Sequence, residues 1–421
     1  MKCGITCACL AVALLLAITC FSQQAPNSAD EKLISKAKAI HERAITLDTH
    51  VDISGINYDP GEKSPTKCTL PKMEKGGLKG VFLAVYVRQT PELNDQGYKV
   101  AYDQAIAKFK AAHNVAERLY PDRCALATSP ADVERIAKTG KRVIMIGVEN
   151  GYPIGTNLVV IKEFYDLGAR YITLSHSDHN QICDSSGPLQ PMYNGLSAFG
   201  KQVVAEMNRL GIMIDVSHIS EKSFFDVIKE TKAPIIASHS GCTALTASDR
   251  NLTDQQLKAL SANGGVIQIV ALGSYLKGDS PERRQAIAKL QSELGYRRMG
   301  RGDMQGMAEQ QRADYTKLGQ VFQERMKEVD AKFPPSKPAT ITDFVDHIDH
   351  AVKIAGIDHV GIGTDFDGGG GVPGFNDHAD APNVTLELVR RGYSEKDIDK
   401  IWGGNLLRVW REVEKKATAK K

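Results

Sequence analysis

The chain has 421 residues, of which 42% are hydrophobic and 24% charged, and its formal net charge is +3. This composition is that of an ordinary folded globular protein, long enough for one large α/β domain or two smaller ones. Because Lys and Arg are interspersed with Asp and Glu, the charge balance does not favour a nucleic-acid-binding protein, and no nucleic-acid partner is expected.

The amino-terminal segment predicts export. Residues 1–22 hold one Lys followed by an apolar stretch of about the length of a signal-peptide core. The stretch is too short and too poorly flanked for a membrane span, so no transmembrane domain is expected in the mature chain. Cleavage after Ser22 would deliver the protein to the periplasm or beyond. Lipidation at Cys20, which gives a membrane-tethered lipoprotein, is the alternative.

Eight apolar, β-branched runs follow a helix predicted over 31–43. They lack strict alternation, as is typical of parallel strands whose two faces are both covered by helices. The predicted strands are 45–51, 80–87, 142–149, 170–176, 212–218, 234–240, 265–271 and 359–365. Helical patterns separate most of them, including one at 98–120 before the third strand, and several end in Gly, a usual helix stop. The alternation predicts a (β/α)8 barrel of the TIM type within one domain, residues 31–415.

One stretch breaks this rhythm. Residues 276–340 are charged and strongly helical, and they precede the helical pattern of the last strand. They predict a helical insertion before that strand. A lid, an oligomer contact and a solvated excursion without a role all remain open.

Metal-ligand side chains recur at the ends of five predicted strands. A barrel of parallel strands collects the carboxyl ends of its strands on one face, so these side chains are expected to converge. His50 and Asp52 lie two apart on one strand and therefore point to the same side. The full set is His50, Asp52, Glu149, His218, His239 and Asp365.

Glu149 is the predicted bridge, since a carboxylate has two oxygens and can bind two cations. Two ligand sets then share it: His50 and Asp52 complete one, and His218 and His239 complete the other. Imidazole and carboxylate donors suit zinc, so the expected cofactor is two Zn²⁺ per chain with a shared hydroxide as nucleophile.

Two aspartates follow the last strand. Asp365 is the predicted general acid/base. Asp367, two residues further on, can face the same cavity. The glycine run 368–371 between them and the next helix lacks the Lys-Ser/Thr of a phosphate loop, and flexible backbone near the site is preferred.

Other motifs are interpreted as structural. Ser precedes His at 175–176, 217–218 and 238–239, but neighbours on a strand point to opposite faces and no GxSxG elbow occurs, so packing or supporting roles are expected for these serines. Among the remaining histidines, surface or packing roles are predicted for His347 and His350, whereas His179 and His378 can line the pocket.

At these residues the chain resembles the renal (membrane) dipeptidase family of zinc peptidases, especially its bacterial members. The resemblance runs from about residue 40 to 412. It implies a barrel with two zinc ions bridged by Glu149 and held by His50, Asp52, His218 and His239. The matching stretches are LDTHVD, GVENGYPIG, YITLSHSDHN, NGLSAFGKQVVAEMNRLGIMIDVSHIS, ASHSGCTALTASDRNLTD, GIGTDFDGG and RGYSEKDIDKIWGGNLLRV.

The resemblance also implies roles for single residues. His176 would contact the substrate carbonyl and the tetrahedral intermediate, and Arg250 would hold the carboxylate of the dipeptide, a task that suits a bidentate guanidinium. Asp365 matches the acid/base aspartate, with Asp367 in support. Asn150 stands where some members have Gly, which places the difference at the pocket rim. The resemblance also implies cleavage of dipeptides, tolerance of a D-residue at their carboxyl end, and a homodimer.

The sequence therefore predicts an exported binuclear zinc dipeptidase. The first rival is another binuclear metal amidohydrolase, such as an N-acyl amino acid deacylase or a lactonase. Such barrels often bridge their metals with a modified lysine, and no Lys ends the third or fourth predicted strand. The second rival, a binding protein that keeps the pocket, conflicts with the presence of both an acid/base candidate and a carboxylate anchor.

Overall fold

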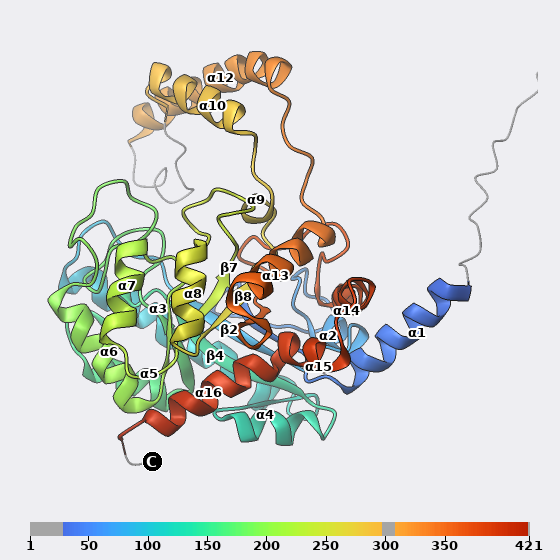
Figure 1. Ribbon diagram of the computed structural model, residues 1–421. Coiled ribbons are helices and arrows are strands. Elements are labelled where there is room, and N and C mark those ends of the chain that lie inside the picture. Colours follow the sequence, from blue (N-terminus) through green and yellow to red (C-terminus); the bar gives the residue numbers. More distant parts are fainter. Residues whose placement is uncertain (1–27, 297–307, 420–421) are drawn as a thin grey trace, which may run out of the picture.

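The computed structural model describes residues 28–296 and 308–419. Within these ranges a single sheet holds nine strands, and eight of them follow one another around a barrel in which every pair is parallel (Figure 1). The barrel strands are β1 (Leu47–Asp52), β2 (Gly80–Tyr86), β4 (Arg142–Glu149), β5 (Ala169–Thr173), β6 (Met213–Asp215), β7 (Ile236–Ser240), β8 (Val266–Ile269) and β9 (Val360–Ile362). Each lies within one residue of, or inside, a predicted strand, so the barrel prediction is confirmed.

The barrel closes between its first and last strands, just beyond the end of β9. The Asp365 backbone N–H donates to the His50 carbonyl at 3.0 Å, and the Asp52 N–H donates to the Phe366 carbonyl at 3.0 Å. These two bonds form the seam that completes the ring of strands. They also bring the chain around Asp365 beside β1, where two predicted metal ligands lie.

Helices cover the outside of the barrel. The helices over and between the strands are α1 (Ser28–Arg43), α2 (Leu70–Lys75), α3 (Asp95–Asn114), α4 (Pro130–Ala137), α5 (Val159–Asp166), α6 (Ala198–Leu210), α7 (Glu221–Glu230), α8 (Asp254–Ala262), α9 (Gly273–Leu276), α13 (Ile341–Ala355), α14 (Ala381–Arg390), α15 (Glu395–Asp399) and α16 (Asn405–Lys416). Serine or threonine caps begin α6, α7 and α8, as expected for groups that accept from the first free N–H groups. Gly168, Gly211 and Gly264 follow α5, α6 and α8 with φ of 99°, 79° and 84°, which confirms them as helix stops.

One connection is more elaborate than predicted. The pattern at 98–120 forms α3, which continues into a π-helical turn, η1 (Val115–Leu119). A short strand, β3 (Cys124–Leu126), then pairs with β4 outside the barrel order, and α4 follows before β4 begins. Neither β3 nor α4 was predicted, and for β3 the reason is that three residues are too few to show a hydrophobic period.

The charged stretch before the last strand forms two helices, α10 (Pro281–Leu294) and α12 (Glu309–Lys332). They pack on each other and stand away from the barrel, beyond α9 (Figure 1). Arg283 of α10 donates to Asp330 of α12 at 2.8 Å and to the Phe333 carbonyl at 2.7 Å. Residues 297–307 of this predicted insertion lie outside the described ranges.

The predicted signal peptide, residues 1–22, also lies outside the described ranges. Of the helices that are described, none has both the length and the apolar character needed to cross a bilayer. Four cysteines are described, and all of them are buried free thiols: Cys68, Cys124, Cys183 and Cys242.

Candidate metal centre

The predicted ligands meet at the carboxyl-terminal edge of the barrel. Glu149 is the last residue of β4, His50 and Asp52 lie in the carboxyl-terminal half of β1, and His239 lies in β7. His218 follows β6 in a turn with φ 70°. Parallel strands bring these ends to one face, which is where barrel enzymes build their sites.

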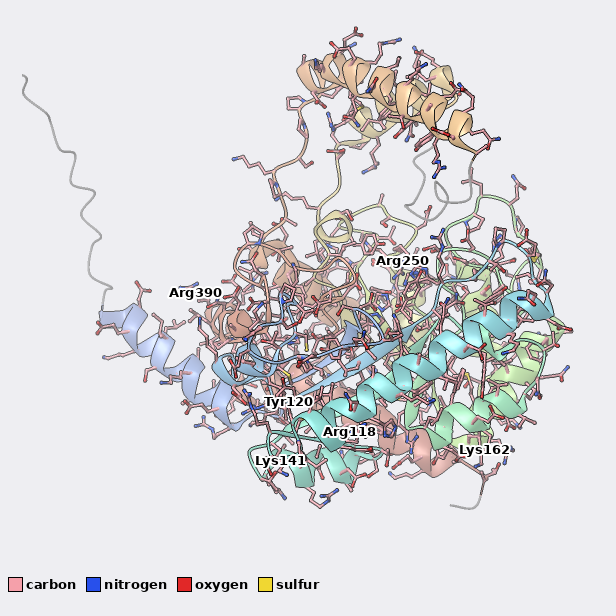
Figure 2. All side chains as sticks on the ribbon, turned by 180° about the vertical axis from the view of Figure 1, so that it is seen from behind. Arg118, Tyr120, Lys141, Lys162, Arg250 and Arg390 are labelled. Carbon is pink, nitrogen blue, oxygen red and sulfur yellow. The ribbon has the colours of Figure 1, made fainter. Side chains whose placement is uncertain are left out.

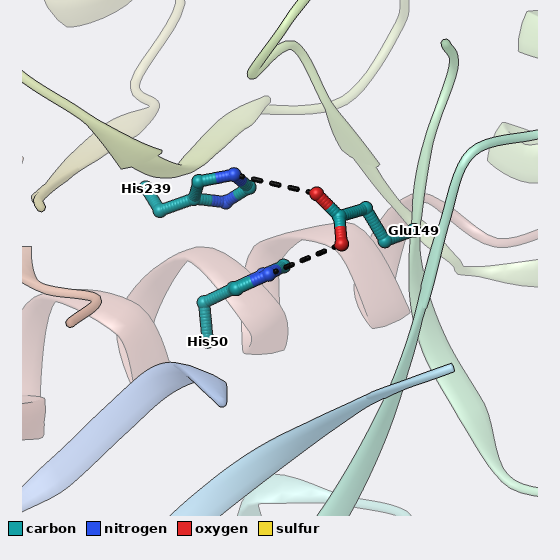
Figure 3. A group of neighbouring side chains, drawn as sticks. All are labelled: His50, Glu149 and His239. Atoms are coloured by element: carbon teal, nitrogen blue, oxygen red, sulfur yellow. Dashed lines mark ion pairs between the residues drawn. The ribbon is translucent and has the colours of Figure 1, made fainter. Parts of the chain in front are cut away.

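The Glu149 carboxylate is the point on which the imidazoles converge. His50 Nε2 lies 3.4 Å from Oε2, and His239 Nε2 lies 3.5 Å from Oε1 on the other side of the carboxylate (Figure 3). His218 Nε2 lies 3.0 Å from the same Oε1. Each carboxylate oxygen therefore has its own imidazole partners, which is the arrangement needed to bind two cations at once.

His176, predicted as a substrate contact, joins this cluster. Its Nε2 lies 3.6 Å from Glu149 Oε1, and its ring packs 4.2 Å from that of His218, centroid to centroid. The ligand atoms that lie within 4.8 Å of one another form two groups, one of His50, Glu149 and His239 and one of Glu149, His176 and His218. These groups overlap at Glu149 and divide the histidines differently from the predicted partition, which paired His218 with His239. The Nε2 atoms of His218 and His239 lie 2.9 Å apart, and both face Oε1.

The pKa shifts of the buried carboxyl groups and imidazoles around Glu149 favour the binding of a cation. Burial alone would raise the pKa of the Glu149 carboxyl, but charge on His50 and hydrogen bonds from His218 and His50 hold it well below its usual range. Burial alone would lower the pKa of His50, yet Glu149 and Asp52 raise it well above its usual value. Burial lowers the pKa of His218 and His239, which are therefore neutral. Burial and the charge of Glu149 raise the pKa of the Asp52 carboxyl, although His50 opposes this, so the two neighbouring carboxyl groups disfavour each other's ionisation and a bound cation would relieve this.

Buried polar atoms that lack hydrogen bonds also favour the binding of a cation. His50 Nε2 and Asp52 Oδ1 are buried 3.7 Å apart, and within the described residues neither makes a hydrogen bond of good geometry. Burying polar atoms in this way is costly unless something binds them. Imidazole nitrogen and carboxylate oxygen together form a donor set that suits zinc. The residues therefore fit a metal.

Asp365 lies at the barrel seam with φ 59°. A Cβ placed on Gly368 would lie 2.2 Å from Asp365 Oδ1 and 2.8 Å from Asp52 Oδ2, so the two carboxylates flank the same small space. Burial, opposed by the charge of His50 and reinforced by Asp52 and Glu149, raises the pKa of Asp365 to about 8. A carboxyl with this pKa can hold a proton near neutral pH and release it, as an acid/base group must.

Arg250 borders a cavity of about 240 Å³ that begins beside His218 and is lined by serine and threonine side chains. Its Nη2 donates to the His239 carbonyl at 3.3 Å, while its buried Nε has no hydrogen-bond partner among residues 28–296 and 308–419. Figure 2 shows Arg250 at the end of the barrel that faces the α10–α12 hairpin, opposite Tyr120 and Lys141. A buried guanidinium N–H without a partner suits an anionic group.

Asp367 does not face the cavity with Asp365, contrary to one expectation. Its two oxygens accept from the backbone N–H groups of Lys67 and Cys68 at 2.8 and 3.2 Å, and so hold that loop to the end of β9. The glycine run is a tight turn: the N–H groups of 368–370 all point at the Asp365 carbonyl.

Two histidines that could have lined the pocket have structural roles. His378 Nε2 lies 2.8 Å from Asp48 Oδ2, and the ring is fully buried. His179 accepts from the Ser185 N–H at 2.9 Å and contacts the Gln190 carbonyl at 2.8 Å. Neither belongs to the groups that converge on Glu149.

His347 and His350, expected in surface or packing roles, are placed away from the site. His347 contacts the Cys242 N–H and the Leu276 carbonyl in the core, and His350 pairs with Asp254 at 2.6 Å.

Asn150 is buried rather than at the pocket rim. Its φ is 79°, in the left-handed region that Gly and Asn tolerate best. Its amide donates to the Val87 carbonyl at 3.2 Å, and its oxygen accepts from the Tyr152 N–H at 3.1 Å. The position therefore shapes the turn after Glu149, which explains why Gly can stand there.

Two aspartates that support the site were missed. Asp48 accepts from the N–H groups of His50 and Thr364 at 3.1 and 2.9 Å, which ties β1 to the chain leading into Asp365. Asp215 accepts from the Ser217 N–H at 3.0 Å in the same way. The available signal was an Asp two residues before the residue whose backbone N–H it accepts from, in LDTH and IDVS, a local bond that Asp commonly makes.

Gly147 makes room for a third residue that was missed, Tyr171. The phenol of Tyr171 lies 3.0 Å from His50 Nδ1, and its ring rests on Gly147, two residues before Glu149. A Cβ at Gly147 would lie 2.0 Å from Tyr171 Cζ.

We therefore expect Gly147→Ala to destabilise the protein by about 2–3 kcal/mol through overpacking. Denaturant unfolding measures this, with Gly55→Ala as the control because its Cβ meets nothing within 4 Å; equal stabilities would contradict the prediction.

A parallel barrel whose carboxyl-terminal edge gathers imidazoles around a shared carboxylate defines a barrel metallohydrolase. The comparison with known families narrows this class. The sequence matches the family "Membrane dipeptidase (Peptidase family M19)" over residues 34–421. The chain therefore belongs to the membrane dipeptidase family, and it is a hydrolase of the metallopeptidase class, as the resemblance predicted.

Individual proteins that are similar to this chain are also described as dipeptidases or metallopeptidases. The chain is 31% identical to dipeptidase tcpJ of Claviceps purpurea over 86% of this chain and 73% of that protein. The crystal structure of the probable dipeptidase PvdM from Pseudomonas aeruginosa superposes with a TM-score of 0.80 at 33% identity, covering 92% of this chain and all of that one. A metallo peptidase from Rhodobacter sphaeroides, liganded with a phosphinate mimic of the dipeptide L-Ala-D-Ala, has the same fold, with a TM-score of 0.67 at 24% identity over 88% and 99% of the two chains.

Proposed function

We propose that this protein hydrolyses dipeptides, including those with a carboxyl-terminal D-residue, with two zinc ions held around Glu149. The observation that carries the proposal is the division of the Glu149 carboxylate: Oε2 faces His50, and Oε1 faces His218 and His239. Because the Glu149 carboxylate can bridge two metal ions, the site does not need a modified lysine as the bridge. This favours a dipeptidase over the deacylases and lactonases that use such a lysine.

Each residue of the site has a role in the proposed hydrolysis. His50, Asp52, Glu149, His218 and His239 would hold the ions, which when bound would polarise the scissile carbonyl and activate water. His176 lies against Glu149 with about a quarter of its side chain exposed, so its Nε2 can reach a substrate carbonyl from the pocket side.

Asp365 moves the protons. Its raised pKa allows a carboxylate oxygen to take a proton from the attacking water and to give it to the departing amine nitrogen. Arg250 binds the free carboxylate of the dipeptide through a guanidinium that still has an unpartnered N–H. This contact fixes the scissile bond relative to Glu149.

The Arg250 assignment gives a substrate-based prediction. Arg250→Ala should lower kcat/KM for dipeptides about 100-fold, because a charge-assisted bond to a carboxylate is worth about 1.5–3 kcal/mol. The same substitution should change little for dipeptides amidated at the carboxyl end, on which the wild-type enzyme is already slow. Arg284→Ala, on α10, is the matched control. Equal wild-type rates on acids and amides would count against Arg250 as the anchor.

A substrate panel tests the function as a whole. Dipeptides that vary in the stereochemistry of each residue, N-acyl amino acids and lactones would be assayed with zinc content measured on the same sample. We expect turnover of dipeptides, tolerance of a carboxyl-terminal D-residue, about two zinc ions per chain, and inhibition by a phosphinate mimic of L-Ala-D-Ala. Turnover confined to lactones or acyl amino acids would replace the proposal with its rival.

Export with cleavage after Ser22 and a homodimer are further parts of the proposal, and lipidation at Cys20 is the alternative to that cleavage. Export rests on the signal-like residues 1–22, and the mass of the mature chain distinguishes cleavage after Ser22 from lipidation at Cys20. The dimer rests on the family resemblance alone, and sedimentation of the purified protein tests it.

A further inference from the structure

Asp215, at the end of β6, lies completely buried beneath the metal centre. Its Oδ1 accepts from the backbone N–H groups of Ser217 and Ser238 at 3.0 and 2.8 Å. Its Oδ2 accepts from the hydroxyl groups of Thr173 and Ser238 at 2.5 and 2.6 Å. One carboxylate thus joins the ends of β5, β6 and β7, and it takes four hydrogen bonds from groups that surround it.

The Ser238 hydroxyl also contacts an imidazole of the site. Ser238 Oγ lies 2.8 Å from Nδ1 of His239, the next residue. A hydroxyl has a single proton to donate. Because that proton is directed to the Asp215 carboxylate, Ser238 Oγ can only accept from His239. Nδ1 of His239 must then carry the hydrogen, and Nε2 presents its lone pair toward Glu149.

We infer that Asp215 and Ser238 are positioning residues that fix the tautomer of His239, so that its Nε2 is ready to bind a metal ion. This inference rests on the proposed zinc site and adds two residues to it. A metal-binding histidine generally needs a partner for its other ring nitrogen, and losing that partner typically costs 10–100-fold in metal affinity. Here the partner is a serine oriented by a buried carboxylate.

Asp215→Asn reverses the chain of donors. The two backbone N–H groups at Oδ1 can only donate, so the amide oxygen of Asn must stay there, and its NH₂ must take the place of Oδ2. Ser238 then accepts from the amide and turns its own proton toward His239. The hydrogen of His239 is thereby moved to Nε2, into the space that the metal should occupy.

Zinc alone is the probe for the first measurement, with competition against a chelator on the full-length protein. Ser238→Ala and Asp215→Asn should each lower zinc affinity 10–100-fold. Ser175→Ala is the matched control: this serine is also buried and also precedes a histidine of the site, His176, but its Oγ has no hydrogen-bond partner within the described chain.

The second measurement follows the tautomer in the metal-free protein. Long-range proton–nitrogen NMR of protein with ¹⁵N-labelled histidine shows which ring nitrogen carries hydrogen, and the signal lost in His239→Gln identifies His239. We expect hydrogen on Nδ1 in the wild type and on Nε2 in Asp215→Asn.

Hydrogen on Nε2 of the wild type, or wild-type zinc affinity in Ser238→Ala, would overturn the inference. If Asp215→Asn fails to fold, Ser238→Ala and the wild-type spectrum still decide. A wild-type protein that binds no zinc would refute the proposed metal centre, whereas the tautomer measured without metal tests the role of Asp215 independently.

Discussion

Glu149→Gln should abolish the binding of metal and lower kcat/KM at least about 1000-fold. Glu149 contacts His50 through one carboxylate oxygen and His218 and His239 through the other. The amide keeps the size of the side chain but removes its charge and replaces one oxygen by an NH₂ group that cannot bind a cation. Metal ions stabilise transition-state charge by several kcal/mol, and each 1.4 kcal/mol is a factor of ten in rate.

The measurement is zinc content and dipeptide turnover on the same preparation of each variant. Glu163→Gln, in α5, is the matched control, because Glu163 is partly buried and its carboxylate accepts from the Tyr102 phenol at 2.9 Å, away from the cluster on Glu149. The control should keep both metal and activity. Full activity of Glu149→Gln with two zinc ions retained would disprove the bridge.

The barrel could be predicted because its strands are long apolar runs between helices with clear stops. The same reasoning placed strand ends too late in several runs: the run at 170–176 ends as a strand at Thr173, and the run at 359–365 ends at Ile362. The residues that follow are apolar or small and buried, but they turn away from the ladder to present side chains. Asp365 adopts positive φ in such a turn, and so does His218, which follows the end of β6 at Asp215. Hydrophobic pattern reports burial and gives no sign of such a turn.

The ligand types could be predicted from their positions at strand ends, but their partners could not. Whether Asp367 faces the cavity depends on the loop at Lys67, 300 positions away in sequence, whose N–H groups bind its carboxylate. The tautomer-setting role of Ser238 depends likewise on Asp215 of a different strand. Sequence spacing shows which side chains share a face along one strand, because side chains alternate there. It does not show which residue of another strand or loop will bind a given side chain.

Asp365→Asn should lower kcat for dipeptides about 100- to 10,000-fold, the usual contribution of a positioned acid/base group. Its carboxyl has a pKa of about 8 because burial and the nearby Asp52 and Glu149 charges disfavour the charged form despite His50. The amide preserves the shape of the turn at φ 59° but can neither release nor accept a proton near neutral pH. Zinc content should stay close to that of the wild type, because Asp365 is outside the groups that converge on Glu149. Turnover and bound zinc, measured together, separate this loss from that of Glu149→Gln.

Asp367→Asn provides the matched control for this variant, since it lies two residues away, also has positive φ at 67°, and binds only the Lys67 and Cys68 backbone among the hydrogen bonds described. Its substitution weakens the hold on that loop, so we expect reduced thermal stability with kcat within about tenfold of the wild type, as for other residues that do not exchange a proton with substrate. A kcat for Asp365→Asn within tenfold of the wild type would remove Asp365 from the proton transfer. An equal loss in both variants would show instead that the turn, rather than the Asp365 carboxyl, is what activity requires.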